Sequence, residues 1–236
     1  CSITPCTNPS ETVLNNAIGM ISGGNAVVIN PHPSAKVTTA KFVGMLNAAM
    51  VSAGAPDNLI CSVIEPTIES AGALMKHPGV ALVVVTGGPA VVKAAMATGK
   101  KCIAAGPGNP PVLVDETAIL ARAARDIVTG AGMDNNIICI VEKEIIAVDA
   151  IADRLKQELV RAGAYLIKES MASRLVKTVV EDNHIAKRFV GKNVSVILHE
   201  IGIEVPDDVR IAFFEADENN PLVQIEQLMP VIPMVR

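Results

Sequence analysis

Short apolar runs alternate with longer amphipathic stretches, and this alternation restricts the fold of the chain more than any other feature. Runs rich in Val, Ile and Ala recur at residues 26–29, 59–64, 80–85, 103–105 and 112–114. Such runs are typical of buried parallel strands. Helical patterns lie at residues 11–21, 35–53, 68–75, 90–97 and 117–128. This order predicts an α/β fold with a parallel sheet and right-handed crossovers.

The pattern loosens after residue 129, where a Gly-rich and then a polar segment follow. Strands are predicted at residues 144–148, 194–198 and 209–215, with a charged helix at residues 149–162. We therefore predict two α/β domains, over residues 1–129 and 130–236. The last apolar run has no partner that the sequence reveals, and the first residue is Cys1 rather than Met. We expect the chain to begin and end inside a longer protein.

Composition excludes several classes of protein. Half of the residues are apolar and 19% are charged, which suits a globular protein with a sizeable core. A net charge of -4 and 2% aromatic residues argue against a nucleic-acid partner. No apolar run approaches the roughly 20 residues of a membrane-spanning helix. The five cysteines form no CxxC pair, so we expect free thiols, no metal site and a reducing cytoplasm.

Two glycine-containing turns are candidate ligand sites. Thr86-Gly87-Gly88-Pro89 follows a strand and opens a helix, where free N–H groups favour an anion such as a pyrophosphate. A tight turn without a ligand is an equally good interpretation, and the GxGxxG fingerprint is absent. The segment 106–111 holds two glycines and three prolines. It is either a stiff structural crossover or a rigid wall for a ligand.

Cys139 is the candidate nucleophile, because it follows a polar segment where the two predicted domains join. Its apolar neighbours equally favour an inert core cysteine. His32 lies at the predicted carboxyl end of a strand, where open α/β sheets bind ligands. The charged run 142–144 is interpreted as solvated surface, and the other histidines as solvated side chains.

Six segments together carry a resemblance to a known family. They are TPCTNP (4–9), NPHP (30–33), TGGP (86–89), GPGNPP (106–111), DNNIIC (134–139) and EQLMP (226–230). In this order they resemble the CoA-acylating aldehyde dehydrogenases of the aldehyde dehydrogenase superfamily, which act on acetaldehyde and propionaldehyde in ethanolamine and propanediol breakdown. The resemblance implies a Rossmann-type cofactor sheet followed by a second α/β catalytic domain, and family members are roughly twice as long.

The resemblance also implies the reaction. Cys139 would attack the aldehyde carbonyl, hydride would pass to NAD, and coenzyme A would release the acyl group from the enzyme thioester. The oxyanion would need donors such as the Cys139 amide. Hydrolytic relatives place an Asn two residues after the first Pro of the 4–9 segment, where this chain has Thr7, with Asn8 one position later. The oxyanion role therefore stays open between Thr7 and Asn8.

Cofactor-binding roles follow from the same resemblance. Thr86, Gly87 and Gly88 would lie beside the cofactor phosphates, and Glu226 would hold the nicotinamide ribose. The cofactor-binding set further includes Pro31 and His32, nearer the adenosine end, together with Pro107 and Gly108. Asn30 replaces a lysine that contacts the adenosine ribose in hydrolytic relatives, so the choice between NAD and NADP stays open.

Hydrolytic relatives carry a water-activating glutamate where this chain has Ala105-Gly106-Pro107-Gly108. Loss of a general base slows hydrolysis by roughly 10²–10⁴-fold, which favours transfer to a thiol such as coenzyme A. The implied partners are a small aldehyde, coenzyme A, further copies in a homo-oligomer and a bacterial microcompartment shell. Two alternatives remain, namely an acyl-phosphate reductase with the same thioester chemistry and a non-catalytic nucleotide-binding module.

Overall fold

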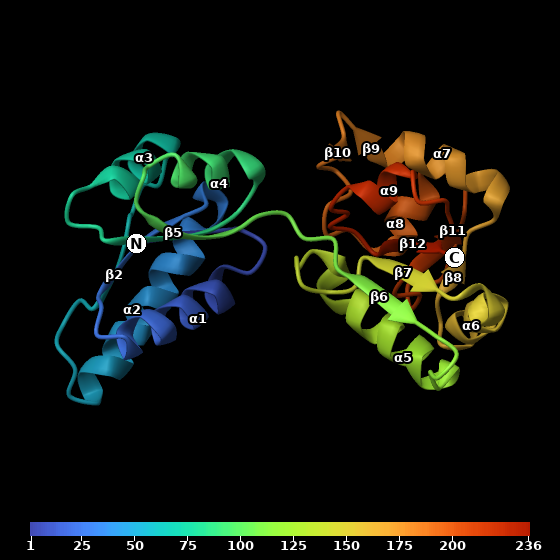
Figure 1. Cartoon of the computed structure of the whole chain (residues 1–236), viewed down its shortest axis with the longest axis horizontal. Helices are drawn as coiled ribbons and strands as arrows, with labels where there is room; N and C mark the ends of the chain where they lie inside the picture. The colour runs from blue at the N-terminus through green and yellow to red at the C-terminus, as the bar shows by residue number, and fades with distance from the viewer. The chain divides into compact units, whose positions relative to one another are not determined.

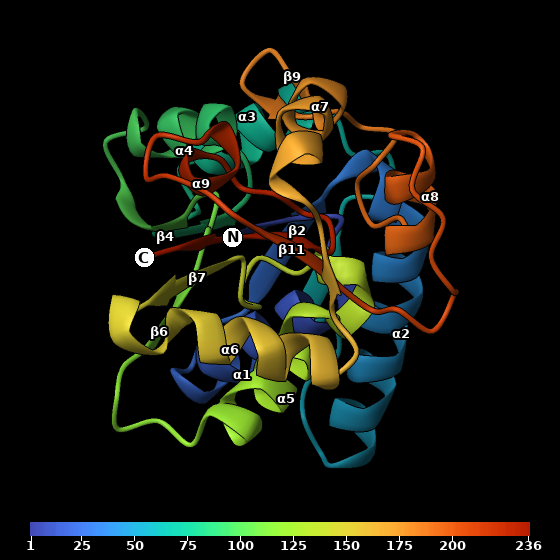
Figure 2. The ribbon, with the colours of Figure 1, turned by 90° about the vertical axis from the view of Figure 1, so that its right-hand side faces the viewer.

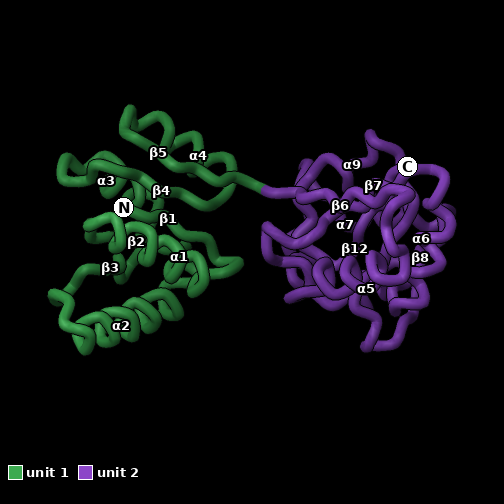
Figure 3. The backbone as a smooth tube through the Cα atoms, turned by 60° about the horizontal axis from the view of Figure 1, so that its bottom comes forward, with its two compact units in different colours: residues 1–107 green, residues 108–236 purple.

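The computed structural model describes all 236 residues, which form two compact units, residues 1–107 and 108–236 (Figure 3). The boundary predicted near residue 129 falls within helix α5 (Leu120–Ala131) of the second unit. Strand β6 (Pro111–Val114) pairs in parallel with β7 (Glu144–Ala147), so it belongs to the second sheet. The alternation of strands and helices continues across the junction, and the sequence pattern therefore does not mark it.

The first unit is a five-stranded parallel sheet with strand order β3-β2-β1-β4-β5 (Figure 3). Its strands are β1 (Ser2–Thr4), β2 (Val27–Pro31), β3 (Ile60–Ser62), β4 (Leu82–Thr86) and β5 (Lys101–Ala105). Its helices are α1 (Pro9–Ser22), α2 (Lys36–Ser52), α3 (Ile68–Lys76) and α4 (Pro89–Met96), with a 3-10 turn η1 (Pro33–Ala35). All these elements except β1 and η1 match predicted ranges to within a few residues. β1 was missed because its polar Ser2 and Thr4 interrupt the apolar pattern.

Helices cover both faces of this sheet, because its strands present apolar residues to both sides. Val27 and Ile29 of β2 pack with α1 and α2. Val83 and Val85 of β4 pack with Ile3 and with helices α3 and α4. Strands β2 and β4, on either side of β1, thus contribute buried side chains to opposite layers, which gives the α/β arrangement with a parallel sheet that the sequence predicts.

The second unit is another five-stranded parallel sheet, with strand order β6-β7-β12-β11-β8. Its further strands are β8 (Tyr165–Leu166), β11 (Ala212–Glu215) and β12 (Val231–Val235). Its other helices are α6 (Asp149–Arg161), α7 (Glu169–Val179), α8 (Val194–His199) and α9 (Pro221–Gln224), with a 3-10 turn η2 (Met133–Asn136). A two-stranded antiparallel ribbon joins β9 (Val180–Glu181) to β10 (His184–Ile185).

Alternate residues of the central strands build the two layers of this unit. Phe213 and Ile232 are paired neighbours that face the layer of α5 and α6. These two helices lie together below the sheet (Figures 1 and 2). Phe214 and Val231 face the opposite layer, which contains α7, α8 and α9. The period of two along β11 and β12 therefore supplies both cores.

Two sequence interpretations are corrected here. Residues 194–198, predicted as a strand, lie in helix α8, where Val194, Ile197 and Leu198 are buried. Their i, i+3, i+4 spacing fits a helix face, and so short an apolar run cannot distinguish the two structures. The apolar run 231–235 does have partners, because β12 pairs with β7 and β11. None of the helices has the length and apolarity that a membrane crossing requires.

Candidate active site

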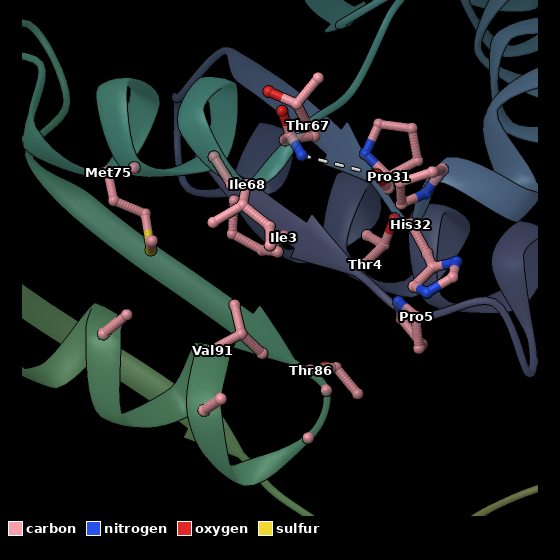
Figure 4. A pocket seen from close by; sticks show the side chains of 18 of the residues that line it. Ile3, Thr4, Pro5, Pro31, His32, Thr67, Ile68, Met75, Thr86 and Val91 are labelled. Atoms are coloured by element: carbon pink, nitrogen blue, oxygen red, sulfur yellow. Dashed lines mark hydrogen bonds between the residues drawn. The ribbon is translucent and has the colours of Figure 1, made fainter.

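The first unit contains a cavity of about 700 Å³ at the carboxyl ends of β1, β2 and β4 (Figure 4). β1 is followed by α1 and then β2 on one side, whereas β4 lies on its other side. Such a topological switch point is where open α/β sheets bind ligands. Of the six residues that the sequence predicts for the cofactor in this unit, Pro107 does not line the cavity, whereas five do: Pro31, His32, Thr86, Gly87 and Gly88.

Helix α4 directs its N-terminus to this cavity. Gly88 is its N-cap, Pro89 occupies its first turn, and Ala90 and Val91 line the cavity. The free N–H groups and the dipole of a helix start both favour an anion. A Cβ on Gly87 would lie 2.8 Å from the Val91 side chain, so glycine permits the close packing of the turn. These features suit the phosphates of a dinucleotide.

Polar side chains also reach the cavity. The Thr4 hydroxyl is buried and has no hydrogen-bond partner in the chain, although the residue lines the cavity. A buried polar atom without a partner is costly, so a ligand hydroxyl or phosphate fits beside it. Asn30 is buried, and its Oδ1 accepts a hydrogen bond of 2.6 Å from Ser70 Oγ. His32 Nδ1 accepts from the Ser34 N–H at 3.2 Å, which holds the ring at the start of η1.

An apolar wall of this cavity was not identified from the sequence. Ile68, Ala71 and Met75 of α3 line it together with residues of α4 (Figure 4). Ile68 is 88% exposed at the start of α3, where a capping box between Thr67 and Ser70 fixes the helix. The sequence signal that could have indicated this wall is a large apolar residue in the first turn of a capped helix. The wall suits the flat apolar faces of a nucleotide base.

Thr7 and Asn8, the two candidates for the oxyanion, lie side by side before α1. The Thr7 hydroxyl donates to Asn8 Oδ1 at 3.2 Å. Asn8 is the N-cap of α1, but its side chain makes no capping hydrogen bond. Neither residue is among those that line the cavity. The Thr7 hydroxyl uses its one O–H in this bond, whereas the Asn8 amide keeps its N–H donors for a ligand. Both oxyanion assignments stay predictions.

In the second unit, Cys139 lies in a turn between η2 and β7. The Val141 N–H donates to the Ile138 carbonyl at 3.5 Å, which closes the turn. Cys139 is a half-buried free thiol, and the next residue, Ile140, is 79% exposed. The sulfur is therefore not sealed in a hydrocarbon core, which is what an inert structural cysteine would require.

The backbone before Cys139 has an uncommon conformation. Asp134, Asn135 and Asn136 have φ values of 48°, 51° and 61°, so three successive non-glycine residues are left-handed. Asn and Asp tolerate this region better than other residues, because their short side chains form local hydrogen bonds. Asn135 donates to the Gly191 carbonyl and to Asn193 Oδ1. These bonds stabilise the turn that precedes the cysteine.

Asn136 and Lys143 form a buried pair on either side of Cys139. Asn136 Nδ2 donates at 2.8 Å to the Ala131 carbonyl and at 2.8 Å to the Glu142 carbonyl. Lys143 Nζ donates at 2.8 Å to the Asn136 carbonyl and at 2.7 Å to Asn136 Oδ1. Both side chains are completely buried. The interpretation of residues 142–144 as solvated surface is therefore wrong for Lys143, because sequence composition cannot show a buried partner.

Burial of the Lys143 ammonium lowers its pKa to about 8, while the negative charges of Glu226 and of the Cys139 thiolate oppose that change. Charged groups influence one another in this way when they lie near one another in a poorly solvated site. Desolvation is the larger cause, as expected for a group with no exposed surface. The ammonium is thus a positive charge next to the candidate nucleophile.

Gly108 and Glu226, both predicted from the resemblance, are brought to the same site. The Gly108 N–H donates to Glu226 Oε1 at 3.1 Å. A Cβ on Gly108 would lie 2.7 Å from the Cys139 carbonyl oxygen, so only glycine fits there. Pro107 precedes Gly108 as the last residue of the first unit. Cys139, Gly108 and Glu226 therefore form one cluster with Lys143.

Comparisons with known proteins agree with this arrangement. The model of the aldehyde dehydrogenase family matches residues 1–183. Acetaldehyde dehydrogenase (acetylating) EutE of Salmonella typhimurium is 46% identical over 242 residues, which cover all of this chain and 52% of that protein. Propanal dehydrogenase (CoA-propanoylating) of the same organism is 41% identical over 238 residues, again over all of this chain and 51% of its own length. The chain spans about half the length of the curated relatives it matches.

Solved structures give the same result. A propionaldehyde dehydrogenase from the fucose utilisation microcompartment of Clostridium phytofermentans superposes with a TM-score of 0.92 at 45% identity, over all of this chain and 55% of that one. The Rhodopseudomonas palustris propionaldehyde dehydrogenase with bound propionyl-CoA also gives 0.92, at 46% identity, over all of this chain and 52% of that one. The predicted resemblance and fold are confirmed, and the chain belongs to the aldehyde dehydrogenase family.

Proposed function

We propose that the protein containing this chain oxidises a short-chain aldehyde to an acyl-CoA, with NAD as the hydride acceptor and Cys139 as the nucleophile. The Cys139 thiolate adds to the aldehyde carbon to give a thiohemiacetal. The hydride of that carbon would pass to NAD, which the cavity of the first unit would hold. The resulting thioester on Cys139 is attacked by the thiol of coenzyme A, which releases acyl-CoA and returns the cysteine. Aldehyde, NAD and coenzyme A are thus converted to acyl-CoA, NADH and a proton.

The close approach of Gly108 to the Cys139 carbonyl is the observation that carries this proposal. Gly108 is the last residue of the segment 105–108 and lies against the backbone of the proposed nucleophile. By resemblance, hydrolytic relatives carry their water-activating glutamate in this segment, whereas here it holds only Ala, Gly and Pro. Without a general base the thioester lasts long enough for a second thiol to reach it.

The first unit supports a dinucleotide as cofactor. The N-terminus of α4, the apolar wall of α3 and the Thr4 hydroxyl offer an anion site, a surface for a base and a polar contact. We assign the phosphates to Thr86, Gly87 and Gly88, and the adenosine end to Pro31 and His32. Glu226 and Pro107–Gly108 complete the set on the nicotinamide side. NADP stays an alternative, since a related engineered glycolyl-CoA reductase has been solved with NADP⁺ bound.

The relatives support the acyl acceptor and the setting. One Rhodopseudomonas palustris structure holds CoA and an acylated cysteine, and the Clostridium phytofermentans relative comes from a bacterial microcompartment. We therefore propose coenzyme A as cosubstrate, and a homo-oligomer that works in the cytoplasm or inside such a shell. Sedimentation of the full-length protein, alone and with shell proteins, tests both parts.

Replacement of the nucleophile tests the reaction. In the full-length protein, Cys139→Ala is expected to abolish aldehyde-dependent NADH formation, whereas Cys61→Ala, at an exposed cysteine of the first unit, is expected to leave it intact. Products of the unaltered enzyme with CoA, phosphate or water as acceptor are then compared. Acyl-CoA as the main product supports the proposal. Acyl phosphate would favour the acyl-phosphate reductase, and full activity of Cys139→Ala would refute the assignment.

A further inference from the structure

Lys143 is a buried charge whose hydrogen bonds do not use all of its donors. An ammonium has three N–H donors. Two of them go to the carbonyl and Oδ1 of Asn136, and no other hydrogen bond from Nζ exists in the chain. The side chain is nevertheless fully buried. A buried cation with an unused donor is costly, and replacing such a group by an apolar side chain is often stabilising. A role beyond stability is therefore needed to explain it.

The charged groups around Lys143 belong to the cysteine site. Glu226 and Cys139 are the negative groups that favour its ammonium form. Glu226 accepts from the Gly108 N–H, and Gly108 lies against the Cys139 carbonyl. Glu144, next in sequence, has its pKa raised by burial, which favours its neutral form. Glu226 and Cys139 are thus the negative groups that oppose the cost of burying this ammonium.

Lys143 also fixes the backbone around the nucleophile. Asn136 lies three residues before Cys139, and Lys143 lies four residues after it. Through Asn136 Nδ2, the Ala131 and Glu142 carbonyls are joined across the segment that holds the cysteine. The Lys143 N–H donates to the Pro110 carbonyl at 2.9 Å, which attaches the same segment to the loop after Gly108. The left-handed conformation of Asn136 is held in place by these bonds.

We propose that Lys143 is a positioning residue for Cys139: its ammonium holds the left-handed turn through Asn136 and supplies a fixed positive charge that favours the thiolate. This inference deepens the proposed function, because it concerns the reactivity of the same nucleophile. It needs no aldehyde, cofactor or coenzyme A in its test.

The rate of Cys139 alkylation by iodoacetamide, followed across pH by peptide mass spectrometry on the full-length protein, tests the proposal. Lys143→Met removes the charge and the donors, whereas Lys143→Gln keeps a donor for Asn136 without the charge. Loss of a nearby positive charge reduces the thiolate fraction. We expect Cys139 alkylation at pH 7 to fall by about three- to tenfold in both variants, with the profile displaced by about half to one pH unit to higher pH.

Exposed Cys61 is the internal standard in every sample, and half-buried Cys102 reports loss of folding. Lys156→Met is the matched control, because Lys156 of α6 pairs with Asp153 of the same helix and with Glu215 of β11, and it is not part of the cysteine site. Its Cys139 profile should overlay that of the unaltered protein. Profiles of Lys143→Met and Lys143→Gln that also overlay it would overturn the proposal.

Folding failure leaves the proposal testable. If Lys143→Met does not fold, the Cys139 alkylation profile of Lys143→Gln tests the proposal. If both unfold, the unaltered protein decides, because coupled titration of a thiol and an ammonium broadens the profile beyond one ionisation. A simple one-proton curve would then contradict the proposal. The unaltered full-length protein could oxidise aldehyde only slowly while the Lys143 variants still show the displaced Cys139 alkylation profile. That result would refute the proposed function and leave the role of Lys143 intact.

Discussion

The two units share one architecture but form their sites in different ways. Each is a five-stranded parallel sheet with helices on both faces. The first leaves a cavity of about 700 Å³ at its strand ends, lined mainly by turns, helix starts and small side chains. The second packs a half-buried cysteine into a turn fixed by left-handed residues and a buried lysine. The site in the first unit is a cavity that a ligand can fill, whereas the site in the second unit holds the Cys139 side chain in a fixed turn.

Two glycines illustrate this difference. A Cβ on Gly87 would approach the Val91 methyl at 2.8 Å, and a Cβ on Gly108 would approach the Cys139 carbonyl oxygen at 2.7 Å. The end of a side chain can move by rotation, but a backbone carbonyl moves only with its chain. The cofactor unit should therefore tolerate change better than the cysteine turn. The following predictions test that contrast, from the largest effect to the smallest.

Asn136→Ala is expected to lower the free energy of unfolding by about 3–5 kcal/mol, since it removes one of the two acceptors of a buried ammonium and leaves a left-handed residue without its side-chain bonds. Denaturant unfolding followed by circular dichroism measures this. Asn25→Ala is the control in the first unit, because Asn25 Nδ2 also donates to two carbonyls but is exposed. Its expected cost is below about 1 kcal/mol. Equal costs would remove the contrast between the units.

The pH dependence of stability should carry the signature of Lys143. Its pKa is lowered from 10.5 to about 8, so below pH 8 the folded state bears the cost of the buried ammonium. As pH rises from about 8 to about 10.5, the folded state loses the proton that the unfolded chain still binds, and the free energy of unfolding should rise by up to about 3 kcal/mol.

Lys143→Met provides the reference for this measurement, because other titrating groups act in both proteins and cancel in the difference. Urea unfolding between pH 7 and pH 10.5 should show the unaltered protein gaining stability relative to the variant. Parallel curves would mean that the ammonium bears no such cost.

Gly108→Ala should destabilise the protein by about 2–3 kcal/mol, as expected when a new methyl meets backbone that cannot move freely. Gly87→Ala should cost less than about 1 kcal/mol, because the Val91 side chain can rotate away. Thermal unfolding of both variants gives the comparison. Gly106→Ala is the control within the same loop, since a Cβ there meets nothing within 4 Å. A smaller cost for Gly108→Ala than for Gly87→Ala would reverse the contrast.

Thr4→Val should weaken NAD binding by about three- to tenfold, the loss of one ligand hydrogen bond, while stability changes by less than about 1 kcal/mol. Thr39→Val is the matched control, because the Thr39 hydroxyl is likewise buried without a partner but does not line the cavity. Calorimetric titration with NAD measures both. Equal affinity in the two variants would contradict a ligand contact at Thr4.

Helices and strands whose apolar residues repeat with the period of their buried face were predictable from the sequence. Strands β2 to β5 of the first unit and helices α1 to α6 follow from apolar periodicity, because local burial repeats with the period of the element. The strand predicted at residues 194–198 is wrong, since its spacing also fits the helix α8. Helix α7 and the β9–β10 ribbon were missed. The position of β12 between β7 and β11 was also invisible, because parallel partners lie far apart in sequence.

The candidate cofactor turns and the candidate nucleophile could be named from motifs, whereas Lys143 could not. The glycines and the proline of the segment 86–89 predict a turn, because the conformational preferences of these residues are local. A lysine between two glutamates predicts an exposed, solvated side chain. Lys143 is nevertheless buried, because it bonds to Asn136 and is enclosed by the packing of the whole turn.

The sequence by itself determined the alternation of strands and helices, the turns at the strand ends and the family resemblance, because each depends on residues close together in the chain. Only the tertiary structure decided that β6 belongs to the second sheet, that Glu226 accepts from Gly108, and that Lys143 is buried beside Cys139. These are contacts between distant or hidden groups, and their free energies arise from desolvation and packing that exist only after the chain has folded.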